Sequence, residues 1–129
     1  MHLITLPSRY TYFSFNDGES LRSQVSKGQF VCDIPGDYSL MALESEAVSG
    51  EHESARDWRC ISIVGQMSFN EIGIAAEITR VLADDEISVL VMSGFKTDYF
   101  FVQDAVLAKA QMALADAGHE FIQDENEGI

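Results

Sequence analysis

The second half of the chain switches between the two-residue apolar alternation of strands and the longer apolar repeat of amphipathic helices. Strands are expected where apolar residues alternate or run together, at 58–64, 87–92, 99–102 and 119–122. Helices are expected at 71–84 and from about Asp104 to Gly118, because each segment gathers its apolar side chains on one face. This pattern predicts the order β-α-β-β-α-β.

That order is typical of an α+β fold in which two split βαβ units form one antiparallel sheet with both helices on the same face, the ferredoxin-like arrangement. Asp104 is expected to cap the second helix at its N-terminus, and Gly118 is expected to end it. The last residues are acidic and lack apolar periodicity. We therefore expect one lobe of this fold at residues 58–123 and a frayed tail at 124–129.

The first half carries a weaker version of the same pattern. Strands are expected at 9–15, 29–34 and 38–43, with a hairpin turn at 35–37 and a short helical piece at 20–25. Residues 44–57 are polar and acidic, and their lack of apolar periodicity is typical of a connector. The pattern predicts a degenerate lobe of the same kind at residues 1–57, connector included, packed with the lobe at 58–123.

The chain has 129 residues, with 21 acidic side chains against 8 basic ones and a formal net charge of −13. This charge disfavours nucleic acid and anionic membranes as partners, because both attract basic surfaces. The first residues lack the basic region and long apolar run of a secretory signal, and no apolar stretch reaches membrane-spanning length. We expect a cytoplasmic protein whose two cysteines, Cys32 and Cys60, are reduced thiols.

Motifs that support catalysis or metal binding are missing from the sequence. The three histidines, His2, His52 and His119, are scattered, and neither a phosphate-binding glycine loop nor an H-E-x-x-H motif occurs. The acidic residues do not follow the D-x-D-x-D-G spacing of a calcium loop. We therefore predict that the protein is not an enzyme and has no catalytic residue, metal or cofactor.

Several short motifs together resemble the ACT domain family, in particular small bacterial proteins with two ACT-like lobes. The motifs are Trp58-Arg59-Cys60, the loop with Phe69 and Gly73, the block from Ser93 to Tyr99, Ala117-Gly118-His119-Glu120, and Asp37-Tyr38-Ser39-Leu40 in the first lobe. The resemblance implies a regulatory module that binds an amino acid or another small ligand where two such units meet. Exposed strand edges in this fold also favour a homodimer.

The resemblance places the candidate ligand site at the loop that enters the helix at 71–84. Free backbone N–H groups and the positive end of the helix dipole suit a carboxylate there, and Gly73 lets a ligand approach the backbone closely. Asp98 would receive the ammonium group of an amino acid, with hydroxyl groups nearby to donate hydrogen bonds. The candidate ligand-binding residues are Ser68, Phe69, Asn70, Ile72, Gly73, Ser93, Thr97 and Asp98, with Asp37 and Ser39 from the first lobe.

Structural roles for the same residues stay open. Ser68 and Glu71 have the spacing of a capping box, which would satisfy the N–H groups of the helix internally. Asp98 and Asp37 lie where turn-forming aspartates are common. Ser68 and Ile72 also stand where the family usually carries an Asp and a Thr. That departure favours a second hypothesis, a protein–protein interaction module of the same fold whose ligand pocket is vestigial.

Overall fold

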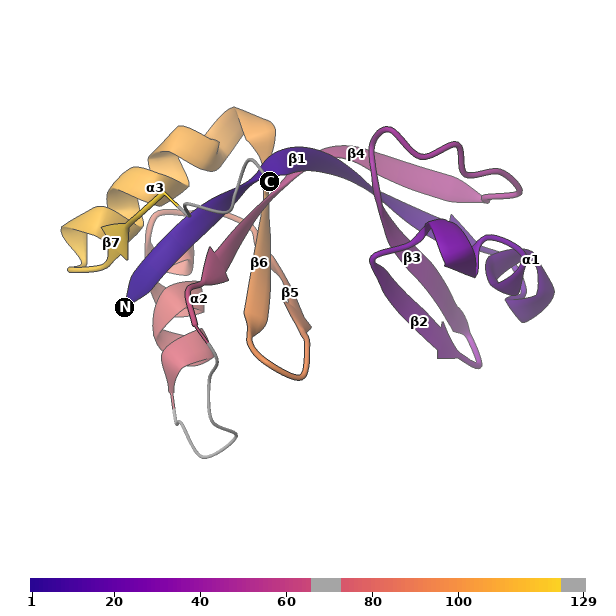
Figure 1. Ribbon diagram of the computed structural model, residues 1–129, viewed down its shortest axis with the longest axis horizontal. Helices are drawn as coiled ribbons and strands as arrows, with labels where there is room; N and C mark the ends of the chain where they lie inside the picture. Colours follow the sequence, from indigo (N-terminus) through magenta and orange to yellow (C-terminus); the bar gives the residue numbers. More distant parts are fainter. Residues whose placement is uncertain (66–72, 124–129) are drawn as a thin grey trace. The chain divides into compact units, whose positions relative to one another are not determined.

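The computed structural model describes residues 1–65 and 73–123, which fold into two compact units. The N-terminal unit is Ser8–Trp58, and the C-terminal unit joins Met1–Pro7 to the segment Arg59–Ile129. Strands β1 (His2–Phe15) and β4 (Glu53–Ile63) contribute residues to both units (Figure 1). The division therefore differs from the predicted lobes at the N-terminus, because the first seven residues belong with the C-terminal unit.

The sheet of the N-terminal unit has the strand order β2-β3-β1-β4. Strands β2 (Phe30–Ile34) and β3 (Asp37–Leu43) form the expected hairpin, and β3 also pairs antiparallel with β1. A short helix, α1 (Gly18–Arg22), begins where Asp17 accepts a hydrogen bond from the backbone N–H of Ser20 (2.7 Å), and a 3₁₀ turn follows at Val25–Lys27. The buried core of this unit consists of Phe15, Leu21, Leu40 and Ala42.

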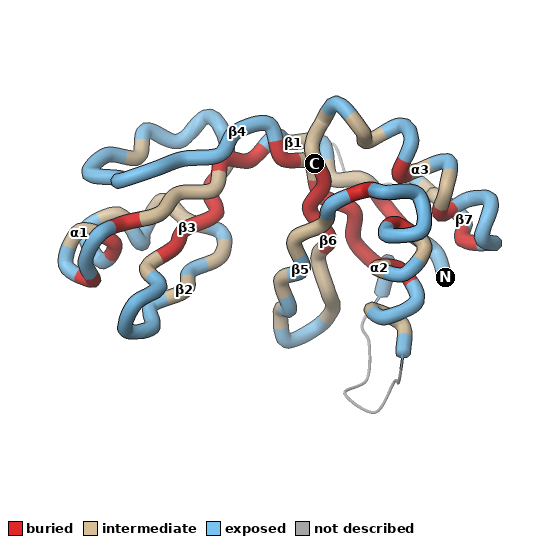
Figure 2. The backbone as a smooth tube through the Cα atoms, turned by 180° about the vertical axis from the view of Figure 1, so that it is seen from behind, coloured by how far each residue is buried: buried red, intermediate tan, exposed pale blue. Residues whose placement is uncertain are grey.

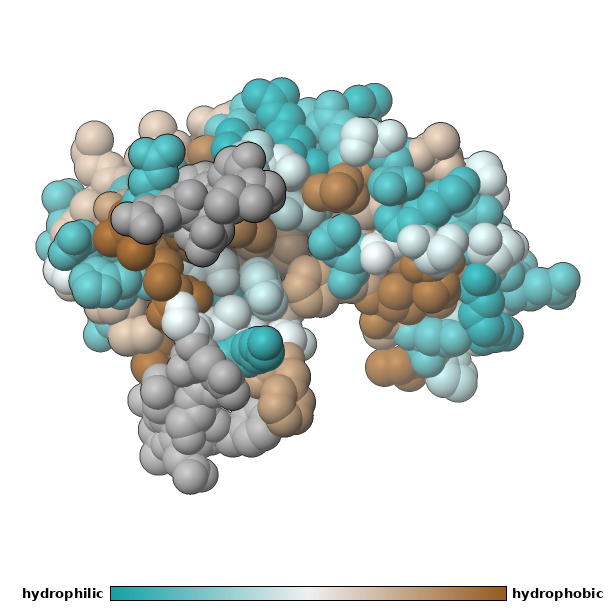
Figure 3. All heavy atoms as spheres, in the orientation of Figure 1, coloured by the Kyte–Doolittle hydropathy of each residue, from teal (hydrophilic) through white to brown (hydrophobic). Residues whose placement is uncertain are grey.

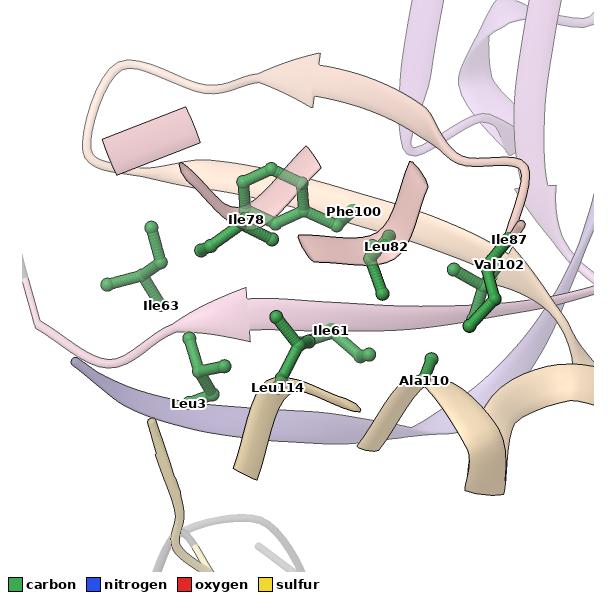
Figure 4. Packing of buried hydrophobic residues seen from close by; sticks show 10 residues of the cluster. All are labelled: Leu3, Ile61, Ile63, Ile78, Leu82, Ile87, Phe100, Val102, Ala110 and Leu114. Atoms are coloured by element: carbon green, nitrogen blue, oxygen red, sulfur yellow. The ribbon is translucent and has the colours of Figure 1, made fainter. Parts of the chain in front are cut away.

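The C-terminal unit reproduces the predicted order β-α-β-β-α-β. After β4 come α2 (Ile74–Asp84), β5 (Leu90–Ser93), β6 (Asp98–Gln103), a 3₁₀ turn (Asp104–Val106), α3 (Leu107–Asp116) and β7 (Glu120–Phe121). The core joins alternate residues of the strands to the apolar stripes of both helices, which therefore cover the same face of the sheet. Figure 4 shows these side chains pointing toward one another: Leu3, Ile61, Ile63, Ile78, Leu82, Ile87, Phe100, Val102, Ala110 and Leu114.

The strand order of the C-terminal unit is β1-β4-β6-β5, with β7 on the other side of β1. The first residues of β1 therefore lie between β4 and β7: His2 pairs in parallel with Glu120, and its carbonyl oxygen accepts a hydrogen bond from Val64 N (2.9 Å). The sequence pattern predicts no strand before Arg9 and none within the connector 44–57. Both predictions were wrong, because these segments are held by backbone pairing with distant strands, which requires no apolar alternation.

The end of α3 confirms the role predicted for Gly118. Gly118 adopts φ 99°, and the N–H groups of Gly118 and His119 donate to the carbonyl oxygens of Ala115 (3.0 Å) and Leu114 (3.1 Å). This pair of bonds is a Schellman motif, which glycine favours at the left-handed position. The predicted start was wrong: α3 begins at Leu107 with Val106 at its N-cap, and Asp104 instead begins the preceding 3₁₀ turn.

Helix α2 ends with the same motif, but Glu86 occupies the left-handed position with φ 60°. The N–H groups of Glu86 and Ile87 donate to Ala83 and Leu82 (both 2.9 Å). Replacing Glu86 with glycine should relieve the strain on the backbone and raise the free energy of unfolding by about 0.5–1 kcal/mol. Thermal unfolding of Glu86→Gly measures this gain. Glu86→Ala removes the same carboxylate without freeing the backbone, and an equal gain from alanine would contradict the explanation.

Candidate functional site

The candidate site involves three segments of the C-terminal unit: the end of β4, the start of α2 and the turn between β5 and β6. The Ser62 hydroxyl on β4 donates to the carbonyl oxygen of Asp98 (3.4 Å), which places the start of β6 beside the last residues of β4. Gly73 precedes α2, and in Figures 1 and 2 the start of α2 and the turn between β5 and β6 lie at the same end of this unit. Gly73 and Asp98, predicted to hold opposite ends of one ligand, therefore share this end of the fold.

The turn between β5 and β6 fixes the candidate carboxylate. The Ser93 hydroxyl donates to Asp98 Oδ1 at 2.6 Å, and the N–H of Gly94 donates to the Thr97 carbonyl oxygen at 2.9 Å. Asp98 is partly buried, and Ser93 lies directly opposite it in the hairpin register. Asp98 therefore closes the hairpin, as its turn role predicted. Its Oδ2 accepts no hydrogen bond from the residues that the structure describes, so this oxygen can accept an ammonium group.

The start of α2 has no side-chain cap from its N-cap residue, Gly73. Gly73 has φ 81° and gives no side-chain cap to the helix, and a Cβ atom at Gly73 would meet no heavy atom within 4 Å. The first N–H groups of any helix lack intrahelical partners, so this end suits an anion. The other loop residues predicted to contact the ligand lie outside the described ranges, as does the predicted capping box: Ser68, Phe69, Asn70, Glu71 and Ile72.

A buried histidine lies against the first turn of α2. His119 is 6% exposed, and its Nε2 lies 2.9 Å from Glu77 Oε2. This is an ion-pair distance for a protonated imidazole, although the ring is not aligned for a hydrogen bond, and Nδ1 also has no hydrogen-bond partner within 1–65 and 73–123. This pair could not be predicted from the sequence pattern, because the two residues lie on separate elements, α2 and the segment before β7.

Asp37 and Ser39 belong to the N-terminal unit, where the structure brings them together. The Ser39 hydroxyl donates to Asp37 Oδ1 at 2.5 Å, and Ser39 is only 7% exposed. Asp37 follows Gly36, which has φ 92°, so the aspartate also has the hairpin position expected of it. Ser39 lines a groove of about 430 Å³ on the sheet. The sequence analysis missed two residues of this groove, Tyr12 and Ser14, whose alternation indicated only a strand.

Both cysteines are free thiols, as predicted, and their environments differ. Burial raises the pKa of Cys60 to about 12. Desolvation raises the pKa of the half-buried Cys32, and the negative charge of Asp37 adds to this effect. No group of three His, Cys, Asp or Glu side chains in the described part of the chain is placed to hold a metal ion. None of the described helices has the length and apolar character needed to cross a lipid bilayer.

Comparison with known proteins places this geometry in context. The ACT domain family matches residues 53–116. The cytosolic arginine sensors for mTORC1, subunit 1, of Homo sapiens and Pongo abelii are each 31% identical over 99 residues, which cover 76% of this chain and 27% of the sensor. The chain thus spans about a quarter of the length of these curated relatives.

Solved structures agree on the fold. The crystal structure of protein Atu0741 from Agrobacterium tumefaciens has a TM-score of 0.82 at 24% identity, with 97% of this chain and 94% of that chain covered. The regulatory subunit of aspartate kinase from Thermus thermophilus has a TM-score of 0.62 at 13% identity, with 90% and 96% covered. At these identities the likeness concerns the fold. Together with the family match, it shows that residues 53–116 are similar to an ACT domain.

Proposed function

We propose that this protein is a non-catalytic regulatory protein that binds a free amino acid. The observation that carries this proposal is the Ser93–Asp98 hydrogen bond (2.6 Å) at the end of the unit where α2 begins. Two comparisons support it: the ACT domain match and the similarity to a protein named as an arginine sensor.

The two ends of an amino acid suit the two sides of this site. The ligand carboxylate would accept hydrogen bonds from the free N–H groups of α2 near Gly73, where the helix dipole favours negative charge. The ligand ammonium would donate to Asp98 Oδ2, while the Ser93 hydroxyl holds Oδ1 in place. Thr97 lies beside Asp98 and offers a second hydroxyl. The proposed ligand therefore bridges the helix and the hairpin of one unit.

Regulation would follow from differential affinity. A ligand that binds one arrangement of the protein more tightly shifts the population toward it, and only by as much as the two affinities differ. In this proposal the N-terminal unit is a degenerate ACT-like lobe, and the active form is a homodimer. The contribution of Asp37 and Ser39 to the same ligand site stays a prediction.

Removing the Asp98 charge should weaken amino-acid binding about tenfold, because Asp98→Asn cannot pair with an ammonium group. A panel of free amino acids is first screened by thermal shift, and the ligand that raises the midpoint most is titrated by calorimetry. Asp116→Asn is the matched control, since Asp116 is exposed at the far end of α3. A full panel that leaves the wild-type midpoint unchanged, or equal affinity in both variants, would refute the proposed site.

The second candidate function is a protein–protein interaction module whose ligand pocket is vestigial. Apolar side chains on an edge strand favour it: Val31 is 45% exposed and Ile34 is 59% exposed on β2, at the end of the strand order. Figure 3 shows brown, hydrophobic atoms on the surface around this strand. Sedimentation velocity distinguishes the two functions, because this module would self-associate without any amino acid and Ile34→Lys would abolish the association.

A further inference from the structure

The groove in the N-terminal unit lies on one face of its sheet and has a volume of about 430 Å³. That volume falls in the range of small-molecule sites. Four of its lining residues carry hydroxyl groups, and all seven belong to the N-terminal unit: Tyr12, Phe13, Ser14, Ser39, Glu53, Ser54 and Ala55. None of them is Gly73 or part of the 93–98 turn, and only Ser39 is also among the residues predicted to contact the amino acid.

The strand register aligns polar side chains across the sheet. Ser39 on β3 is the partner of Ser14 on β1 and of Cys32 on β2, so these three residues form one row on the same face. Tyr12 belongs to the next row on that face, because it lies two residues before Ser14. Asp37, two residues before Ser39, shares the face and accepts the Ser39 hydrogen bond. The face therefore carries a group of four polar residues, Tyr12, Ser14, Asp37 and Ser39, with the apolar Met41 opposite Tyr12.

Most of these hydroxyl groups have no side-chain hydrogen-bond partner among residues 1–65 and 73–123. Tyr12, Ser14 and Ser54 form no side-chain hydrogen bond with any residue of the described ranges, although Tyr12 and Ser14 are partly buried. Partly buried hydroxyl groups are ordinarily satisfied by protein, water or ligand. Ser39, the most buried of the four at 7% exposure, is held by Asp37. Ser39 and Asp37 are thus held by their mutual hydrogen bond. The hydroxyl groups of Tyr12, Ser14 and Ser54 remain able to donate hydrogen bonds to a ligand and accept hydrogen bonds from it.

The charges around the groove favour a ligand that carries a positive charge. Its lining holds one carboxylate, from Glu53, and no Lys, Arg or His. Glu53 makes no ion pair with the residues that the structure describes, and the Asp37 carboxylate lies at the margin through its bond to Ser39. An anion would meet only negative charge here, while a cation would meet two carboxylates on a protein of net charge −13.

We propose that this groove is a second binding site, specific for a small aliphatic amine. The ammonium group is held by the Asp37 carboxylate, and the rest of the molecule lies along the Tyr12, Ser14 and Ser39 hydroxyls. The carboxylate is pre-oriented because Ser39 donates to its Oδ1, so binding does not require the side chain to be ordered first. The neighbouring hydroxyl groups donate hydrogen bonds to polar groups of the amine and accept hydrogen bonds from them.

The test compares three linear probes of similar length that differ in charge: 1,4-diaminobutane, 1,4-butanediol and succinate. Each is titrated into the isotope-labelled full chain at constant ionic strength, and the amide resonances of both units are followed by NMR. We expect saturable shifts in β1, β3 and the start of β4 with the diamine only. Asp37→Asn should weaken the diamine about tenfold and Tyr12→Phe a few-fold, while Asp116→Asn should leave its affinity unchanged.

Every other result overturns the proposal. Equal shifts with butanediol would mean that the groove recognises hydroxyl groups rather than an ammonium. Diamine shifts that spread over the acidic surface without saturating, or that persist in Asp37→Asn, would show an adventitious cation only. Tyr12→Phe removes a single oxygen from a partly exposed ring and should not disturb the fold. It therefore tests the groove even if Asp37→Asn disturbs the β2–β3 hairpin. The test of the first site through Asp98→Asn does not depend on these outcomes, because Asp98 is not in the groove.

Discussion

Phe100→Ala will lower the free energy of unfolding by about 3–5 kcal/mol, because it deletes a fully buried ring from the middle of the C-terminal core. Phe100 lies on β6 and its cluster includes Ile78 and Leu82 of α2, so the cavity would separate the sheet from that helix (Figure 4). For a chain of this size the midpoint of thermal unfolding should fall by roughly 10–20 °C. Calorimetry or circular dichroism measures the shift.

Phe95→Ala is the matched control, since it removes the same ring from a residue that is 76% exposed. Its effect on the midpoint should stay within a few degrees, as is usual for surface positions. If the two variants unfold at the same temperature, the buried cluster described around Phe100 does not hold the C-terminal unit together.

Because of Cys60, the free energy of unfolding should fall by about 2 kcal/mol between pH 7.5 and pH 10.5. Burial raises the pKa of its thiol from 9.0 to about 12 in the folded protein. The folded state therefore keeps its proton when the unfolded chain has already lost it. Since the pKa of Cys60 is raised in the folded state, the stability that this thiol contributes is fully present below pH 9. It is lost as the pH rises toward 12. Urea unfolding at several pH values measures the decline.

Cys60→Ala removes the ionisable group, so its unfolding free energy should fall less steeply over the same pH range. Other titrating side chains, such as tyrosine and lysine, affect both proteins equally and cancel in the difference. Cys32→Ala is the control, because Cys32 is only partly buried on an edge strand, and this variant should keep most of the wild-type decline. Parallel curves for the wild type and Cys60→Ala would contradict the assignment.

The fold of the C-terminal unit could be predicted because its signals are local. The apolar stripe of α2, with Ile78 and Leu82 fully buried, repeats at helical spacing, and Gly118 marks the end of α3. The order of helices and strands in this unit follows from the spacing of the apolar residues. The position of Asp98 at the end of a hairpin could also be predicted, since a turn and an aromatic strand frame it.

The remaining features depend on contacts between distant residues. The first residues of β1 and the segment 53–57 have no apolar alternation of their own, and only pairing with β7 and neighbouring strands makes them extended. The groove could not be predicted for the same reason. Tyr12 and Ser14 face Ser39 only because of the register between β1 and β3, which a one-residue shift would reverse.

The sharing of β1 between the two units has a consequence for biosynthesis. Leu3 belongs to the same buried cluster as Leu114, and the chain at His2 and Leu3 pairs with Glu120 and Phe121. Contacts between residues so far apart in the chain form slowly, because a long loop must close first. During synthesis on the ribosome, the pairing of His2 and Leu3 with β7 cannot form until β7 has left the exit tunnel. Deleting residues 1–7 will therefore disturb the C-terminal unit rather than the N-terminal unit.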